Sequence, residues 1–183
     1  VGETGMGIAG VDVTVDGPLD VPEEERVPLA TLSGADGGFE FAGLAPGHYA
    51  LHAQPGPNVR QDPDAPLLET SLPEVSSATP VLVTLTRGAV IRGQTLGGAH
   101  QPLAGYVVIG IGAGGAHTWS STTDAKGRFE LVVPADTTWD VQVSLPPTGA
   151  TSAGENTQYT ERKVRAGTKD LVLQFVPMLP TGG

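Results

Sequence analysis

The sequence has no cysteine among its 183 residues. Disulfides, thiolate metal sites and cysteine nucleophiles are therefore excluded, while the redox compartment stays undetermined. No apolar run approaches the length needed to span a bilayer, so we expect no membrane insertion. Basic residues are also few: 10 lysines and arginines stand against 20 acidic residues, for a net charge of −10. This imbalance disfavours nucleic acid and anionic membranes as partners.

Glycine and proline, by contrast, are abundant. They make up about 23% of the chain, against roughly 12% in average proteins. Leucine, valine, isoleucine and phenylalanine still form about a quarter of it, which is enough for a buried core. Short strands joined by many turns satisfy both facts. The chain begins with Val1 and carries no signal peptide, so we expect a mature product or a piece excised from a longer chain.

The sequence contains an internal repeat with a period near 90 residues. Residues 33–41 match residues 123–131 at an offset of 90, and residues 8–11 match residues 103–106 at an offset of 95. The first offset also pairs Tyr49 with Trp139, Leu51 with Val141, Ala53 with Val143, Val81 with Leu171, Val83 with Leu173 and Leu85 with Phe175. Five matches in the same order indicate two copies of one module.

Charge divides the chain in the same way. Residues 1–88 carry 13 acidic and 3 basic side chains, whereas residues 89–183 carry 7 of each. We therefore expect two domains, at 1–87 and 88–183, which are joined near Arg87 and Gly88.

The local patterns are those of β-strands. Apolar residues alternate with others at 11–16, 39–41 and 49–53, and residues 81–85 and 171–175 are rich in β-branched or aromatic side chains. Hairpin-type turns are expected at the Asp-Gly and Asp-Ala-Lys-Gly sequences of the two copies. No stretch shows sustained helical periodicity. The predicted fold is therefore all-β, with two tandem antiparallel β-sandwiches of about seven strands each.

Two motifs carry a resemblance to a known family. Residues 121–131 (Ser-Thr-Thr-Asp-Ala-Lys-Gly-Arg-Phe-Glu-Leu) and residues 43–49 (Gly-Leu-Ala-Pro-Gly-His-Tyr) resemble the signature turns of carboxypeptidase regulatory-like domains. That family belongs to the transthyretin-like, or prealbumin-like, sandwiches, beside Cna B-type and starch-binding-like domains. The resemblance covers nearly the whole chain, twice, and implies a secreted or cell-surface bacterial protein. Residues 134–138 depart from the family pattern, which usually has Pro-Gly at this place.

The histidines and the acidic clusters do not predict a metal site. His48 and His52 lie on the outer face of one expected strand, about 13 Å apart at roughly 3.3 Å per residue, which is too far for one ion to bridge. The clusters at 23–25 and at Asp62 and Asp64 are typical of solvated charge, with a weak calcium site as the alternative. We expect no metal and no cofactor.

Three motifs of cofactor-binding, catalytic or crosslinking proteins are either incomplete here or lack the structural context that they require. Residues 110–115 match the glycine pattern of dinucleotide-binding loops, but a strand-like run follows instead of the required helix. A Gly-x-Ser-x-Gly nucleophile turn is absent. The Lys–Asn or Lys–Asp crosslink of Cna B-type domains needs a lysine on the first strand, where the second copy has Arg92 and the first copy has no lysine at all. We therefore expect no catalytic residues and no crosslink, although a pair of acids that meet in space, as in glycosidases, stays open.

Carbohydrate binding is the strongest binding hypothesis. Flat sugar faces stack on exposed aromatic rings, and Trp119 and Tyr159 are the aromatic residues outside the expected core positions. We expect Trp119 to be exposed, and both residues are candidate ligand contacts. The long segments 54–66 and 145–158 occupy equivalent places in the two copies, where loops on a rigid scaffold can acquire binding functions.

These observations favour a non-catalytic structural or interaction segment of a secreted or cell-surface protein, with the periplasm as another location. Its expected partners are another protein or the neighbouring domains of a longer chain. The alternatives are a carbohydrate- or protein-binding module that acts through the two long loops, an accessory domain of an enzyme outside this chain, and a subunit of an extracellular fibre assembled through edge strands.

The first copy lacks the counterpart of one strand. In the second copy an expected strand at 89–94 precedes residues 103–106 by about a dozen residues, while at an offset of 95 Val1 corresponds to Leu96. A sandwich without that strand has an open edge.

Three outcomes follow from this open edge. The strand can belong to residues upstream, the edge can be tolerated, or another chain can donate a strand. The tail beyond Phe175 is a poor donor, because Pro177 and Pro180 have no N–H for a ladder. We favour excision from a longer tandem array.

Overall fold

The computed structural model describes residues 5–112, 118–144 and 159–174. These residues form β-strands and loops, with one short 3-10 turn, η1 (Glu23–Glu25). The chain divides into two compact units, Val1–Arg87 and Gly88–Gly183. Within the described ranges, no helix has the length and apolar character needed to cross a membrane.

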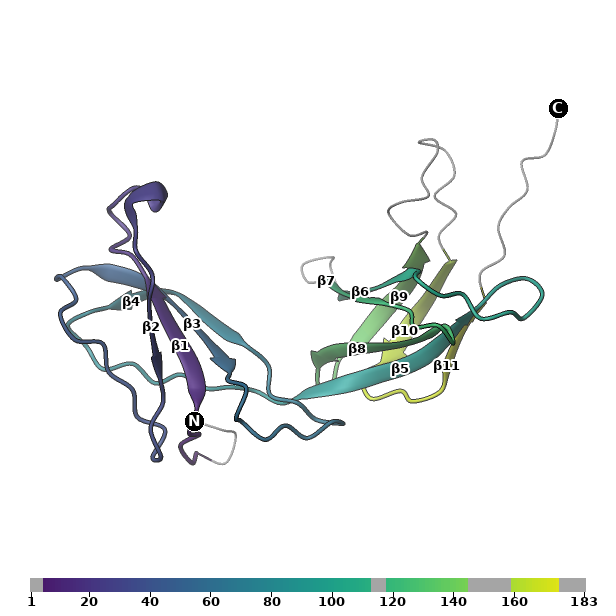
Figure 1. The fold of residues 1–183 in the computed structure, drawn as a ribbon, viewed down its shortest axis with the longest axis horizontal. Helices are drawn as coiled ribbons and strands as arrows, with labels where there is room; N and C mark the ends of the chain where they lie inside the picture. The colour runs from purple at the N-terminus through teal and green to yellow at the C-terminus, as the bar shows by residue number, and fades with distance from the viewer. Residues whose placement is uncertain (1–4, 113–117, 145–158, 175–183) are drawn as a thin grey trace. The chain divides into compact units, whose positions relative to one another are not determined.

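The second unit is a sandwich of two sheets (Figure 1). Its strands are β5 (Gly88–Leu96), β6 (Val107–Gly112), β7 (Thr118–Thr122), β8 (Arg128–Pro134), β9 (Thr138–Ser144), β10 (Tyr159–Arg165) and β11 (Leu171–Gln174). One sheet has the order β10-β9-β6-β7 and the other the order β11-β5-β8. The predicted all-β sandwich is confirmed here, with seven strands among the described residues. The expectation of purely antiparallel pairing is wrong at one place, because β11 pairs with β5 in parallel.

Alternating side chains of both sheets fill the space between them. The larger sheet contributes Val108, Trp139, Val141, Val143 and Val164, and the smaller sheet contributes Ile91, Phe129, Leu131, Val133 and Leu173. All ten are at most 7% exposed. Burial of large apolar side chains stabilises a fold by about 1.5–3 kcal/mol each, so this cluster is the main source of stability of the unit.

The first unit repeats one of these sheets. Its strands are β1 (Val11–Asp16), β2 (Leu29–Leu32), β3 (His48–Pro55) and β4 (Thr70–Ser76). They pair in the order β2-β1-β3-β4, which is the order of the four-stranded sheet of the second unit taken from β7 to β10. The inner face of β1 and β3 carries the buried residues Val11, Val13, Val15, Tyr49, Leu51 and Ala53.

Among residues 5–87 the structure assigns one sheet of four strands and no second sheet. The all-β prediction holds for this unit, but the expected number of about seven strands is not reached in its described part. Residues 39–41 and 81–85, which we expected to be strands, have no strand assignment. Their counterparts in the second unit, β8 and β11, do not pair with each other but lie on either side of β5. Because the described residues contain no counterpart of β5, the two flanking segments lack the central strand that would make them a sheet.

Both units share a buried hydroxyl that joins two segments. Ser33 Oγ donates to Ile8 O at 2.6 Å and accepts from Val11 N at 2.9 Å. Thr123 Oγ1 bonds to the equivalent carbonyl and amide, at Leu103 and Tyr106, with the same two distances. We call each arrangement a hydroxyl clasp. The repeat in the sequence therefore corresponds to a repeated set of structural contacts.

The turn at residues 134–138, where the sequence departs from the family pattern, forms without a glycine. Asp136 takes a left-handed conformation, with φ of 57°, which replaces the glycine usual at such turns. Thr137 Oγ1 donates to Pro134 O and accepts from Trp139 Nε1 at 2.7 Å. The turn thus also supplies the hydrogen-bond partner of a buried indole.

Candidate functional site

The structure does not expose Trp119 as the sequence suggested. Its ring is partly buried against the core of the second unit and meets Trp139 edge to face, with ring centroids 5.2 Å apart. The expectation of an exposed Trp119 is therefore wrong. Tyr159 lies in β10 opposite Val143 on β9, and its side chain lies outside the described part of the structure.

A histidine on the outer face of β3 lies between a serine and an acid, which the sequence analysis did not anticipate. His52 Nδ1 lies 2.9 Å from Ser71 Oγ, and its Nε2 lies 3.7 Å from Glu69 Oε2. Along the same face His48 Nδ1 lies 2.9 Å from Glu74 Oε1. The outward direction of both histidines is as predicted, but their partners depend on the pairing of β3 with β4, which the sequence alone does not provide.

The geometry around His52 is that of a cross-strand polar contact. In a hydrolytic triad the acid is buried, and N–H donors stand ready for the oxyanion. Here Glu69 is 70% exposed and His52 is 40% exposed. The register places His52 directly opposite Ser71 in an ordinary antiparallel ladder. The arrangement can hold the two strands in register, and it lacks the enclosed cleft that acyl transfer uses.

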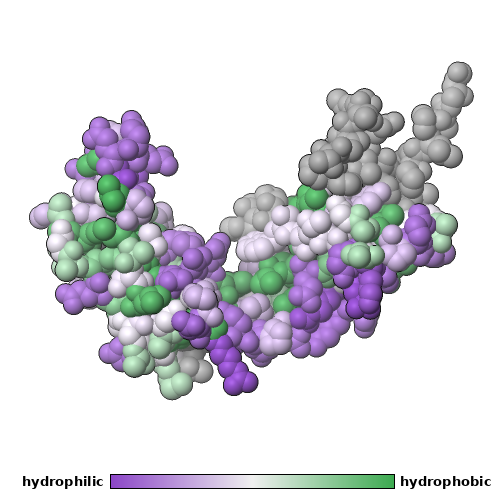
Figure 2. Space-filling model, in the orientation of Figure 1, coloured by the Kyte–Doolittle hydropathy of each residue, from purple (hydrophilic) through white to green (hydrophobic). Residues whose placement is uncertain are grey.

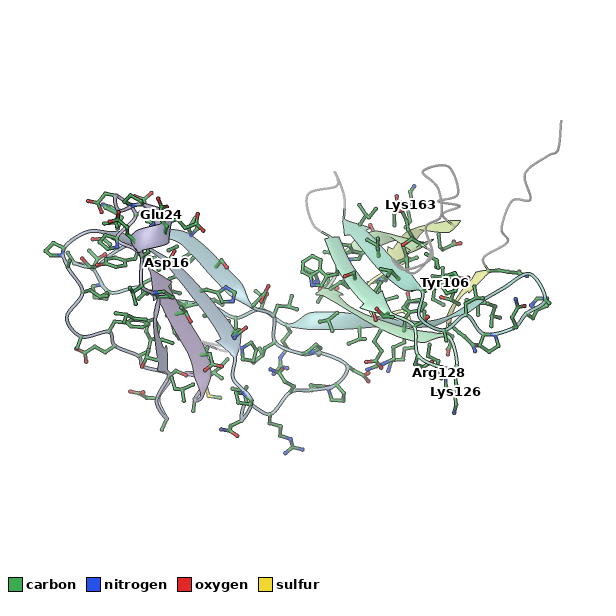
Figure 3. All side chains as sticks on the ribbon, turned by 45° about the horizontal axis from the view of Figure 1, so that its top comes forward. Asp16, Glu24, Tyr106, Lys126, Arg128 and Lys163 are labelled. Carbon is green, nitrogen blue, oxygen red and sulfur yellow. The ribbon has the colours of Figure 1, made fainter. Side chains whose placement is uncertain are left out.

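The acidic clusters of the first unit lie at its surface. Glu23, Glu24 and Glu25 form η1, none of them is buried, and Figure 3 shows Glu24 on this turn. The adjacent Arg26 donates to the carbonyls of Val21 and Leu19. Within the described ranges, no three histidine, aspartate or glutamate side chains converge as metal ligands would.

The glycine-rich run 110–115 begins inside β6 and continues into residues outside the described part. β7 follows it and pairs with β6 in antiparallel register, from Val107 opposite Thr122 to Ile111 opposite Thr118. The strand-like run that the sequence predicts after these glycines is therefore confirmed as β7. On β5, Arg92 Nε donates to Glu130 Oε1 at 2.7 Å, an ion pair across the sheet at the position where a crosslinking lysine would be expected.

Of the two long segments, 54–66 is described and 145–158 is not. The first is held by its own polar groups. Leu67 N donates to Gln61 Oε1, Asp64 N donates to Asp62 Oδ1, and Arg87 Nη1 donates to Ala65 O. These contacts fix the conformation of the segment and join it to Arg87.

The most distinctive site is an apolar slot in the first unit. We define the slot as the space over the inner face of β1 and β3, between residues 39–41 and residues 81–85. A hollow of about 450 Å³ lies at one part of it. Apolar side chains of Val15, Phe39, Phe41, Leu44, Tyr49 and Leu51 line it together with Glu40 and residues 75–81, which include Ser76, Ser77 and Thr79. A second hollow of about 20 Å³, with room for about one water molecule, is lined by Phe39 together with Ile8, Val11, Val13, Ser33, Gly37, Ala53, Val83 and Leu85.

Phe39 lines both hollows, so the two lie next to each other over the same strands. The aromatic rings at the edge of the slot are less covered than their counterparts. Phe39 and Phe41 are partly buried, whereas Phe129 and Leu131 of the second unit are 3% and 1% exposed. Figure 2 shows hydrophobic residues at the surface of the first unit.

Comparison with known proteins gives no family assignment. No protein-family model matches the sequence, and no curated protein matches it. Among solved structures, the Bacillus anthracis TIE protein matches with a TM-score of 0.38 and 14% identity, over 97% of this chain and 33% of that chain. The chain thus spans about a third of that protein.

Two pilins match in a similar way. A single-residue variant of the shaft pilin SpaA from Lactobacillus rhamnosus GG has a TM-score of 0.37 and 13% identity, over 94% of this chain and 87% of that chain. GBS52, the minor pilin of Streptococcus agalactiae, has a TM-score of 0.35 and 13% identity, over 97% and 88%. All three TM-scores are below 0.5, so these matches assign no function to the chain.

Proposed function

We propose that this chain is a non-catalytic structural segment of a secreted or cell-surface bacterial protein, and that its second unit transmits tension along the chain. The location comes with the resemblance to carboxypeptidase regulatory-like domains. The mechanical role is supported by one observation, the pairing of β5, the first strand of the unit, with β11, the last strand in its described part.

β5 and β11 lie side by side and run parallel, with Leu171 opposite Gly93 and Gln174 opposite Leu96. When the chain is pulled from its ends, force enters β5 at Gly88 and β11 at Gln174, at opposite ends of this pair. The hydrogen bonds of a parallel ladder run across the strands, so a force along the strands loads them together. If two paired strands were instead pulled apart from one shared end, their hydrogen bonds would break one at a time. The unit is therefore built to resist extension.

The repeated contacts also support a structural role. The features common to both units are the hydroxyl clasps, the Asp-containing turns and the apolar core, and each of them stabilises the fold. A partner protein or neighbouring domains would attach at the ends of the segment.

Single-molecule pulling tests the mechanical role. Because the chain has no cysteine, handles can be attached at chosen sites in the full chain. Arg87→Cys with Gln174→Cys loads β5 and β11 in shear. Arg87→Cys with Ala135→Cys loads β5 against β8 from one end, because Gly88 lies opposite Pro134. We expect a several-fold higher rupture force in the first geometry, with a length gain of roughly 300 Å at about 3.6 Å per residue. Equal forces in the two geometries would refute the mechanical role.

Labelling with a fluorophosphonate probe tests the absence of catalysis. Ser71 beside His52 is the serine that such a probe would find if the cross-strand contact were a reactive one. We expect the intact mass to stay unchanged after long exposure, as in the matched variant Ser71→Ala. Stoichiometric labelling that this variant abolishes would instead identify a hydrolase.

A further inference from the structure

The edge strands of the three described sheets differ in how well they are protected against pairing with another chain. The free side of an edge strand offers backbone N–H and C=O groups to a further strand, and proteins block it with proline, charge, bulges or short length. β2 and β11 have four residues each, and Pro73 interrupts β4. β8 carries Arg128 and Glu130, and in β10 Lys163 takes a left-handed φ of 59° within a bulge. Five of the six described edges are therefore protected.

The strand β7 is the exception. It is an edge of the four-stranded sheet of the second unit, with β6 between it and β9 (Figure 1). Its sequence, Thr-Trp-Ser-Ser-Thr, contains no charged residue and no proline, and its ladder with β6 has no register shift. Ser120 and Thr122 are exposed. This edge is therefore open to a further strand.

The ladder with β6 determines which backbone groups of β7 point away from the sheet. Thr123 N donates to Tyr106 O at 2.9 Å. Along an antiparallel strand, residues bonded to one neighbour alternate with residues whose N–H and C=O groups point the other way. The backbone groups of Trp119 and Ser121 therefore face β6, whereas those of residues 118, 120 and 122 point outward. The open edge thus offers three donors and three acceptors.

The counterpart of β7 in the first unit, β2, lacks one of these donors. At the offset of 90, Pro28 stands at the place of Thr118. Ser33 N donates to Val11 O, so by the same alternation position 28 points outward, where proline has no N–H. The two copies of the module thus differ at this edge: the first is blocked and the second is open.

We propose that β7 pairs with β7 of a second copy of this chain, antiparallel across a two-fold axis at Ser120. In this register Ser120 lies opposite itself, and residue 118 lies opposite residue 122. The outward N–H and C=O groups of these residues then bond across the axis. The two four-stranded sheets become one continuous sheet of eight strands, with the order β10-β9-β6-β7 in each half.

Two properties identify a second copy as the occupant. The register places serine opposite serine and threonine opposite threonine, and such hydroxyl pairs stabilise antiparallel strands. Charge also permits the contact. Residues 89–183 carry 7 acidic and 7 basic side chains, whereas residues 1–88 carry 13 and 3. Two second units therefore meet without the repulsion that a large net charge of one sign would cause.

This pairing goes beyond the mechanical role and does not depend on it. β7 lies in the other sheet from β5 and β11, so dimerisation leaves the ladder that we propose to carry tension unchanged. One pair of short strands buries little surface, so the dimer should be weak and reversible, with a dissociation constant of roughly 0.1 mM.

Sedimentation of the full chain at rising concentration, up to about 1 mM, measures the association. Residue-resolved hydrogen exchange over the same range locates it. We expect the average mass to rise from one chain toward two. The outward amides of Ser120 and Thr122 should exchange more slowly as the dimer forms, whereas those of Trp119 and Ser121, which already bond to β6, should not change.

Two variants and their mixture identify the occupant. Ser120→Lys and Ser120→Glu each place like charges opposite one another on the axis, and each should weaken self-association at least tenfold. Mixed in equal amounts, they place lysine opposite glutamate and should restore the dimer. Thr79→Lys, at an exposed site of the first unit, adds the same charge as Ser120→Lys and should leave the association unchanged. Tryptophan fluorescence in urea confirms that each variant is folded.

Three results would overturn the proposal. The first is a chain that stays monomeric up to about 1 mM, which would leave β7 to a different partner. The second is self-association that both Ser120 variants leave intact, which would place the contact elsewhere. The third is a mixture of the two folded variants that stays monomeric. The pulling experiment reads the mechanical role separately.

Discussion

The indole rings of Trp119 and Trp139 meet edge to face across β6, with an angle of 86° between their planes. Gly110 lies between them. It is the ladder partner of Trp119, and a Cβ on it would lie 3.6 Å from the ring of Trp139. Because this glycine carries no side chain, the two rings on the neighbouring strands can meet above it. The contact makes Trp119 part of the fold.

Substitution of either tryptophan should therefore lower the stability of the second unit. We expect Trp139→Ala to cost about 3–5 kcal/mol, as is usual for a large buried aromatic residue. Trp119→Ala should cost about 1–3 kcal/mol, since it loses partial burial and an aromatic pair worth about 0.5–1.5 kcal/mol. Urea unfolding, followed by the fluorescence of the remaining tryptophan, measures both, and Trp119→Phe is the conservative control. If Trp119→Ala left the free energy of unfolding unchanged, the ring contact would contribute nothing to the stability of the unit.

Two buried threonines of the second unit should respond in opposite ways to the same change. Thr123 Oγ1 makes both bonds of its hydroxyl clasp. Thr95 is fully buried, and its Oγ1 has no hydrogen-bond partner among the residues that the structure describes. An unpaired buried polar group costs about 1–3 kcal/mol. We therefore expect Thr95→Val to stabilise the unit by about 1 kcal/mol and Thr123→Val to destabilise it by about 1–3 kcal/mol.

The exposed neighbour Thr122 provides the control for this pair. Thr122→Val should change stability by less than about 0.5 kcal/mol, as surface substitutions usually do. Both tryptophans lie in the second unit, so their fluorescence in urea reports on this unit alone. Destabilisation by Thr95→Val would mean that its hydroxyl has a partner, and the explanation from an unpaired group would then be wrong.

The sequence predicted the second unit well, because alternation determines which face of a strand is buried. Leu51 and Ala53 belong to an alternating run, the repeat pairs them with Val141 and Val143 on β9, and all four are buried. The repeat also indicated which segments are equivalent. These are properties of single strands and of their order along the chain.

The remaining features depend on contacts between strands that no local pattern records. Trp119 was expected to be exposed because it falls outside the core positions that alternation and the repeat indicate, whereas its partial burial comes from Gly110 and Trp139 on other strands. The contact of His52 with Ser71 depends on the register of β3 and β4. Residues 39–41 have the alternation of a strand, but a strand needs a partner, and the central one is absent from the described first unit.

Equivalent phenylalanines should contribute unequally to stability. Phe129 is almost fully buried, and we expect Phe129→Ala to cost about 3–5 kcal/mol. Phe39 lies at the edge of the slot and is only partly buried, so Phe39→Ala should cost about 1–2 kcal/mol of the stability of the first unit, because less apolar area is lost. Hydrogen exchange with mass spectrometry resolves the two units separately. Equal losses would mean that the slot is already covered in solution.

Removal of divalent ions should leave both units unchanged. The acids of η1 are exposed, and Asp62 accepts a bond from the backbone of Asp64 rather than converging with it on an ion. We expect the melting temperature to stay the same with a chelator or with added calcium. Intact mass should equal the sequence mass, because no internal crosslink is expected. A rise of several degrees with calcium would show that the acidic segments of the first unit bind it.

Acid should remove one specific contribution to the stability of the second unit. Asp124 Oδ1 accepts from the N–H groups of Arg128 and Lys126, each at 2.8 Å, in the turn from which these two basic side chains extend (Figure 3). These hydrogen bonds lower the pKa of Asp124 below its ordinary value of 3.8, and the bond from the backbone N–H of Arg128 is the largest cause. A carboxyl with a lowered pKa in the folded state stabilises the fold above its unfolded pKa, and this contribution is lost as the pH falls through the folded pKa.

The variant Asp124→Asn keeps the oxygen acceptor but not the charge. We expect it to be less stable than the natural chain at neutral pH, and the difference to shrink once the pH falls below about 3.8, as the natural carboxyl becomes protonated too. Tryptophan fluorescence in urea, measured from neutral pH downward, follows the difference. Thr122→Val, which changes no charge, is the control and should show no such trend. A difference that stays constant down to pH 2, or that grows in acid, would mean that the charge on Asp124 does not stabilise the turn.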